Sequence, residues 1–164
     1  MQKPSITIYT DGAARGNPGP GGYGIVMLSG PHRKELSQGY IHTTNNRMEL
    51  LAVIVALESL KHKNSNVTIF TDSRYVVDAV EKGWVFGWEK IRFKKKKNRD
   101  LWQRFLIIYR QHQIKFIWVK GHASNRENER CDRLAVEASM KKELLEDVGY
   151  NPDEESDSEI LSSL

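Results

Sequence analysis

Two of the acidic residues in this chain occupy positions typical of metal ligands. Asp11 follows an alternating β-branched stretch, residues 5–10, and comes directly before a glycine-rich turn. Asp72 ends a second such stretch and comes before a sequence that begins a helix. If these stretches are parallel neighbours in a sheet, their carboxyl ends lie side by side, where α/β sheets form ligand sites. Two carboxylates placed there repel each other unless a hard divalent cation, above all Mg²⁺, joins them.

Two further acids, Glu49 and Asp132, lie in helical sequences. Glu49 shares its helical face with Ala52 and Ala56, which directs its side chain toward the sheet. It also follows Asn46 by three residues, a capping-box spacing that would explain it without a metal. Asp132 is flanked by arginines, and such helical acids usually lie on a solvated face. Taken singly, each acid therefore also has a purely structural explanation.

The elements that must position these acids predict an α/β fold. Alternating apolar residues predict strands, and apolar residues at helical spacing predict helices. We expect strands at 5–11, 24–28, 35–41, 67–72 and 114–119, and helices at 44–61, 73–83, 100–112 and 126–143. The glycine-rich stretch 12–22 is expected to be turn or loop throughout. The order βββαβααβα predicts a five-stranded mixed sheet flanked by helices.

Charge is divided unevenly along the 164 residues. Residues 1–142 contain all 25 basic and 13 of the 21 acidic side chains, a net charge of +12, and the acids after Lys142 contribute −8. A strongly basic body favours a polyanionic partner, first of all nucleic acid. The acidic end lacks periodic apolar residues. We therefore expect a folded domain over 1–145 and a disordered tail over 146–164.

Composition excludes several classes of protein. No apolar run approaches the ~18 residues of a membrane span, and the N-terminus lacks the apolar region of a signal peptide. A single cysteine excludes a disulfide framework and a cysteine-rich zinc site. The expectation is a monomer in the reducing cytoplasm, without a membrane partner.

The combination of motifs resembles bacterial type 1 ribonuclease H. The motifs are Tyr9–Gly12, Gly16–Gly19, Thr43–Leu50, Thr71–Ser73, Asp100–Trp102, Trp118–His122 and Asn128–Asp132. They run in the family's order over roughly residues 5–140, and the Thr43–Leu50 block is highly specific. The resemblance implies a ribonuclease H fold and hydrolysis of the RNA strand of RNA–DNA hybrids, which leaves 3′-hydroxyl and 5′-phosphate ends.

The same resemblance assigns the catalytic residues. Asp11, Glu49, Asp72 and Asp132 would hold two Mg²⁺ ions, with Mn²⁺ able to substitute. His122 would be a catalytic proton shuttle or an aid to product release. Hydrolysis of a phosphodiester needs a nucleophile at neutral pH and neutralisation of charge at phosphorus. Clustered acids with few histidines agree with metal ions as the source of both.

The resemblance also assigns contacts with the hybrid. Asn17, Asn45 and Asn46 would lie along the minor groove, where the 2′-hydroxyl distinguishes RNA from DNA. The residues that would contact the DNA strand are Thr44 and Asn98 on a phosphate, Tyr75, Trp84 and Trp88 along the sugars, and the basic run Lys94, Lys95, Lys96 and Lys97. Only 11 residues separate Trp88 from Asp100, so the basic protrusion of the family is shortened here. We expect Trp102 and Trp118 to lie in the core instead.

Three alternatives share this fold. A transposase or integrase acting on DNA typically uses three acids and carries further DNA-binding domains. A catalytically silent hybrid-binding module would have lost at least one acid, and all four are present. A reverse-transcriptase-derived domain would belong with a polymerase portion, which this chain lacks.

Overall fold

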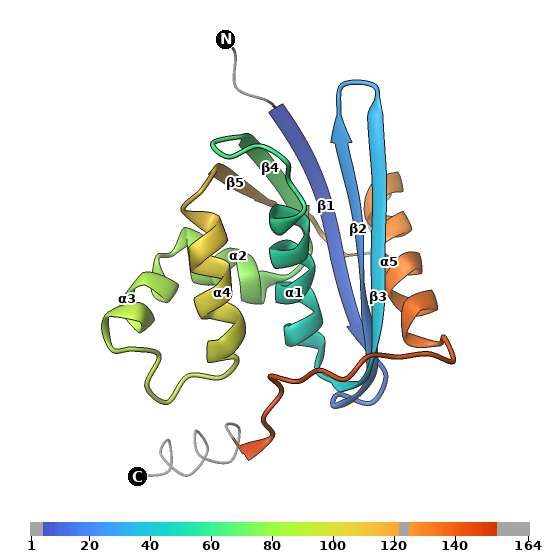
Figure 1. The fold of residues 1–164 in the computed structure, drawn as a ribbon, viewed down its shortest axis with the longest axis vertical. Coiled ribbons are helices and arrows are strands. Elements are labelled where there is room, and N and C mark those ends of the chain that lie inside the picture. The colour runs from blue at the N-terminus through green and yellow to red at the C-terminus, as the bar shows by residue number, and fades with distance from the viewer. Residues whose placement is uncertain (1–4, 122–124, 154–164) are drawn as a thin grey trace.

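A five-stranded mixed sheet forms the centre of the molecule (Figure 1). The computed structural model describes residues 5–121 and 125–153. The strands are β1 (Ser5–Ala14), β2 (Gly19–Ser29), β3 (His32–Thr43), β4 (Asn66–Thr71) and β5 (Gln113–Trp118), in the order β3-β2-β1-β4-β5. β1, β2 and β3 are antiparallel, while β4 is parallel to both β1 and β5. The mixed sheet expected from the sequence is confirmed.

Helices cover both faces of this sheet. They are α1 (Asn45–Glu58), α2 (Arg74–Glu81), α3 (Trp84–Lys90), α4 (Arg99–Tyr109) and α5 (Arg126–Ser139). Successive strand residues point to opposite faces, so Ile25 joins the main core with α1 while its neighbour Val26 points to the α5 side. α5 stands apart from the other helices, alongside β2 and β3 (Figure 1). Along the described stretches, every helix is too short or too polar to cross a membrane.

The glycine-rich stretch is mostly strand, so the expectation of a continuous loop is wrong. β1 extends through Gly12 to Ala14 and β2 begins at Gly19, which leaves residues 15–18 as the turn. The reason is packing. A Cβ on Gly12 would lie 2.4 Å from the backbone nitrogen of Glu49, so glycine here lets α1 lie directly on β1.

Two further expectations are corrected. The basic stretch after residue 82 contains a short helix, α3, which has no clear apolar period in the sequence. Trp102 is fully buried, as expected, but Trp118 is 37% exposed. The Trp118 indole Nε1 donates a hydrogen bond to the Asp72 carbonyl oxygen at 3.1 Å, and the guanidinium of Arg74 lies 3.9 Å from its ring centroid. This ring covers polar backbone at the surface rather than filling the core.

The first residues of the acidic C-terminal stretch pack against the rest of the protein. Leu145 forms backbone hydrogen bonds with β3, to Ile41 and Gly39, and Asp147 forms an ion pair with Arg47. Contacts with the body therefore continue past the boundary at 145 that the charge pattern predicts, because Asp147 has a buried cationic partner. Residues 154–164 of the expected tail lie outside the described residues.

We predict that Gly12→Ala destabilises the protein. The added methyl group forces α1 away from β1, and such overpacking costs about 1–3 kcal/mol. The melting temperature should fall by about 2–4 °C per kcal/mol in a domain of this size. Gly87→Ala in α3 is the matched control, because nothing lies within 4 Å of its added Cβ. A Gly12→Ala variant that melts like wild type would show that α1 and β1 are not in tight contact.

Candidate active site

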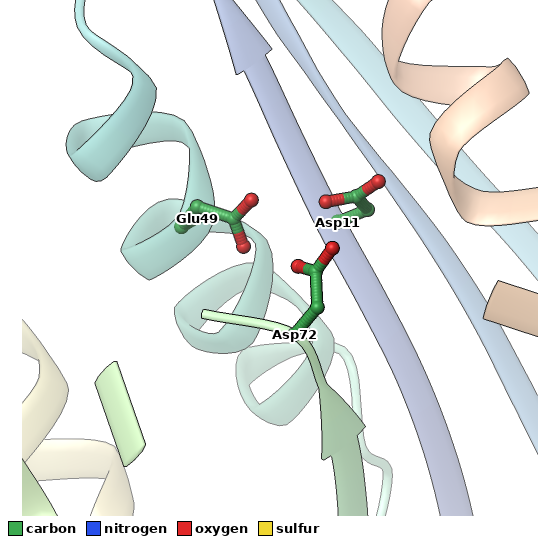
Figure 2. A group of neighbouring side chains, drawn as sticks. All are labelled: Asp11, Glu49 and Asp72. Atoms are coloured by element: carbon green, nitrogen blue, oxygen red, sulfur yellow. The ribbon is translucent and has the colours of Figure 1, made fainter. Parts of the chain in front are cut away.

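Three carboxylates from three elements meet at one edge of the sheet. Asp11 lies near the end of β1, Asp72 directly follows β4, and Glu49 lies near the N-terminus of α1. β1 and β4 are parallel neighbours, in register from Ser5 opposite Asn66, so their carboxyl ends coincide. One oxygen from each acid lies within 4.8 Å of the others, and the three side chains converge on a common space (Figure 2).

Backbone geometry holds two of these acids together. The Gly12 amide donates hydrogen bonds to Asp11 Oδ1 at 2.9 Å and to Glu49 Oε1 at 3.1 Å. The close approach of α1 to β1 at Gly12 makes the second bond reachable. The helix cap is Thr44, whose hydroxyl accepts from the Arg47 amide. The capping-box explanation of Glu49 from Asn46 is therefore wrong, and the Glu49 side chain reaches β1 instead.

The electrostatics of the cluster are those of a site that needs a cation. Burial, with the charges of Asp72 and Asp132, raises the pKa of Asp11 to about 7, although its hydrogen bond with Glu49 opposes the rise. Burial and the Asp11 charge raise the pKa of Glu49 well above its usual value. Glu49 Oε2 is buried and has no hydrogen-bond partner among the described residues. A divalent cation would compensate both effects, and oxygen-only ligands suit a hard ion.

The fourth acid, Asp132, lies on the wall of the same cleft. This cleft has a volume of about 470 Å³, and Asp11, Glu49 and Asp72 also line it. Asp132 is half-buried on α5 and does not belong to the cluster of three. The structure thus gathers all four predicted acids around one cleft, with three in close contact. His122 lies outside the described residues.

The predicted minor-groove residues border this cleft and a second recess. Asn45 and Asn46 line the cleft, and Asn17 Oδ1 accepts a hydrogen bond from the Asn45 amide at 2.9 Å. The second recess, of about 180 Å³, is lined by Asn17, Thr44, Asn46, Tyr75, Lys97 and Asn98. Asn46 and Tyr75 line both hollows. Residues far apart in the sequence therefore form one continuous polar surface.

Of the aromatic and basic residues expected on the DNA side, Tyr75 lies on α2 and the others lie on and after α3. Trp84 is 48% exposed, whereas Trp88 packs edge-on against the buried Trp102 ring. Lys94, Lys95, Lys96 and Lys97 follow α3 in a turn-rich segment, and Lys96 Nζ lies 5.3 Å from the Trp88 ring centroid. The shortened protrusion thus keeps aromatic and cationic groups together.

Two residues of the site were missed by reasoning from sequence. Asn128 on α5 is buried, lines the cleft, and its Oδ1 has no partner among the described residues. Arg47 is 1% exposed and hydrogen-bonds to Asn98 in the second recess. Both lie within motifs that identified the family. No periodicity or spacing signal, however, marks an individual asparagine or arginine as buried beside a site.

Comparisons with known proteins agree with this geometry. The RNase H family model matches residues 3–140. Ribonuclease H of Desulforamulus reducens is 60% identical over 148 residues, which cover 87% of this chain and 92% of the relative. Ribonuclease H of Trichodesmium erythraeum is 56% identical over 154 residues, covering 91% of this chain and 98% of the relative. Ribonuclease HI of a Synechocystis species is 53% identical over 152 residues, covering 89% and 94%.

Solved structures are similar in fold as well. LC9-RNase H1 aligns with a TM-score of 0.77 and 30% identity, over 96% of this chain and 86% of that protein. LC11-RNase H1 in complex with RNA/DNA hybrid aligns with a TM-score of 0.64 and 29% identity, over 81% and 95%. Family model, relatives and structures all confirm the resemblance carried by the motifs. The chain belongs to the RNase H family.

Proposed function

We propose that this chain is a metal-dependent endoribonuclease that hydrolyses the RNA strand of RNA–DNA hybrids. The observation that carries the proposal is the cluster of Asp11, Glu49 and Asp72, within 4.8 Å of one another and with a buried Glu49 oxygen that has no partner among the described residues. The similar LC11-RNase H1, solved with an RNA/DNA hybrid, supports the substrate class. The basic body favours a polyanion as well.

The cofactor we propose is Mg²⁺, two ions per site, with Mn²⁺ able to substitute. Asp11, Glu49 and Asp72 would hold the ions, and Asp132 would contribute from α5, where it lines the same cleft. Two bound ions would supply an activated water and neutralise charge on the scissile phosphate. The chain's own task is to keep the carboxylates converged, and the Gly12 amide does part of it by fixing Asp11 and Glu49.

Proton transfer and substrate positioning fall to other residues. We assign His122 the role of a proton carrier or an aid to product release, and the expected ends are 3′-hydroxyl and 5′-phosphate. Asn17, Asn45 and Asn46 offer small polar groups that suit the 2′-hydroxyl in the minor groove. Such contacts distinguish RNA from DNA but do not distinguish one base from another, so we expect cleavage without sequence specificity.

The DNA strand would follow the second recess and α3. Thr44 and Asn98 line the recess and would hold a phosphate, while Tyr75 joins the recess to the cleft. Trp84 and Trp88 provide apolar surface for sugars, flanked by the Lys94–Lys97 run. Both strands are thereby assigned to one continuous surface.

We further propose that the protein acts as a monomer in the cytoplasm. The four acids assigned to the site line one cleft within a single chain, which supports a site that is complete in the monomer. The sole cysteine, Cys131, is buried and unpaired, which agrees with a reducing compartment.

Cleavage of three labelled substrates in parallel tests this function. We expect an RNA–DNA hybrid to be cut in its RNA strand with Mg²⁺ present, whereas double-stranded and single-stranded RNA remain intact. EDTA should abolish cleavage. Equal cleavage of single-stranded RNA, or cleavage of the hybrid in EDTA, would contradict the proposal. Cleavage of the DNA strand would favour the transposase-like alternative.

We predict that Asp11→Asn abolishes cleavage, retains hybrid binding and raises the metal-free melting temperature. Removing one charge relieves repulsion in the buried cluster, and a gain of ~1 kcal/mol corresponds to roughly 2–4 °C. Because the pKa of folded Asp11 is about 7, the gain should be largest above pH 7 and shrink as the pH falls toward 4, where wild type is itself protonated. The variant should also gain less stability from Mg²⁺.

Thermal melts in EDTA and in Mg²⁺ at pH 5 and pH 8 measure both effects. If Asp11→Asn melts below wild type in EDTA at pH 8, Asp11 is a structural turn residue and the repulsive cluster is refuted.

We predict that replacing Lys94, Lys95, Lys96 and Lys97 with Ala raises KM at low salt and leaves kcat nearly unchanged. Each lost phosphate contact should flatten the log–log dependence of affinity on salt by about 0.9. Lys61→Ala with Lys63→Ala is the control, because both side chains are exposed beyond the far end of α1. The control should keep the wild-type slope. A wild-type slope in the quadruple variant would mean that this run does not touch the substrate.

A further inference from the structure

The buried Arg47 side chain has all five of its N–H donors engaged. Nε donates to Asp147 at 2.7 Å, and Nη2 donates to Asp147 at 3.0 Å and to Asp100 at 2.8 Å. Nη1 donates to Asp100 at 2.8 Å and to Asn98 Oδ1 at 3.2 Å. A guanidinium has five donors and no acceptor. Four of these bonds neutralise the charge, and the fifth reaches a neutral amide in the second recess.

That fifth bond determines which way the Asn98 amide faces. Because Arg47 can only donate, the Asn98 atom next to it must be the oxygen. The amide nitrogen then faces the other way, and Nδ2 donates to the Tyr75 hydroxyl at 3.0 Å. Both Asn98 and Tyr75 line the recess. The orientation suits an anion, because phosphate oxygens accept hydrogen bonds and are repelled by an amide oxygen.

Asp147 also contacts the residue that precedes Thr44, a residue of the recess lining. Its Oδ2 accepts a hydrogen bond from Thr43 Oγ1 at 2.7 Å. The next residue, Thr44, lines the recess and caps α1. One carboxylate from the C-terminal segment therefore contacts the neighbours of two recess residues: Thr43, which precedes Thr44, and Arg47, which binds Asn98.

The segment that carries Asp147 is itself held in place. After α5 it runs toward the N-terminal ends of α1 and α4 (Figure 1), and Leu145 pairs with β3 on the way. A Cβ on Gly149 would lie 1.9 Å from an Asp100 carboxylate oxygen, so the backbone passes directly against that side chain. The Tyr150 ring lies 6.0 Å from the Arg47 guanidinium.

We infer that Arg47 and Asp147 are positioning residues for the phosphate-binding recess, which makes the C-terminal segment Leu145–Tyr150 part of the substrate-binding apparatus. The inference rests on the proposed function, because it concerns how that function's substrate is held. A purely stabilising role explains these charges less well. Buried ion pairs are often no more stabilising than apolar side chains of similar volume. An apolar side chain in place of Arg47, however, would leave the Asn98 amide without the donor that orients it.

A double-mutant cycle between Asp147→Asn and Asn98→Ala tests the inference. Binding of a labelled RNA–DNA hybrid is measured in EDTA, which separates affinity from catalysis. Each single variant should weaken binding about three- to tenfold, the range for one oriented hydrogen bond. The loss of affinity in the double variant should be smaller than the product of the two single losses, because Asp147 acts partly through Asn98. In Mg²⁺, Asp147→Asn should raise KM with kcat nearly unchanged.

Two controls separate positioning from loss of stability. Ile69→Val removes a methylene from the buried core and lowers stability without touching the recess. Glu58→Gln weakens a bidentate ion pair with Arg104 elsewhere on the surface. Both should keep wild-type affinity at temperatures well below melting. Thr43→Val, which removes only the hydroxyl that contacts Asp147, should weaken binding more mildly and serves if Asp147→Asn does not fold.

Multiplicative effects in the cycle would overturn the inference, as would wild-type binding by Asp147→Asn and Thr43→Val. The inference would also be overturned if Ile69→Val weakened hybrid binding as much as Asp147→Asn does, when the two variants lose the same amount of melting temperature. Failure of the proposed function looks different, because wild type itself would then leave the hybrid uncut.

Discussion

The mutual repulsion of buried carboxylates is the constraint around which this molecule is organised. Asp11 is 5% exposed and Glu49 is 4% exposed, and Asp72 lies beside them. Burying carboxylates together in this way costs free energy, because they lose their hydration. The fold enforces it by placing the carboxyl ends of β1 and β4 side by side and pressing α1 onto Gly12. The folded protein loses stability by holding these carboxylate oxygens together, a trade-off that is common at functional sites.

The second group of buried charges, around Arg47, consists of attracting rather than repelling partners. Arg47 is fully compensated by Asp100 and Asp147, so it adds order without repulsion. It lies two residues before Glu49 on the same helix, and α1 therefore links the carboxylate cluster to the second recess. A displacement of α1 would move both at once. The short block Thr43–Leu50 therefore supplies residues to both groups of buried charges.

Much of this arrangement was predictable, and what was missed has physical reasons. Strand alternation and the positions of Asp11 and Asp72 predicted the mixed sheet and the meeting of two acids. The glycine-rich strand ends were mistaken for loop because the pattern of a strand is carried by side chains, which glycine lacks. The expectation that Trp118 lies in the core is wrong because its indole Nε1 reaches the Asp72 carbonyl oxygen at the surface. The contacts of Asp147 depend on a buried partner 100 positions away, which no local pattern reveals.

Titration of the Asp11 and Glu49 carboxyl groups by carbon-13 NMR tests the central claim most directly. Without metal, burial and the neighbouring charges should raise the pKa of Asp11 to about 7 and that of Glu49 well above its usual value. Added Mg²⁺ should shift both titrations to lower pH, because a bound cation stabilises the ionised forms. If Asp11 titrates near its ordinary value of 3.8, and Mg²⁺ leaves both titrations unchanged, the carboxylates are not a repulsive metal-binding cluster.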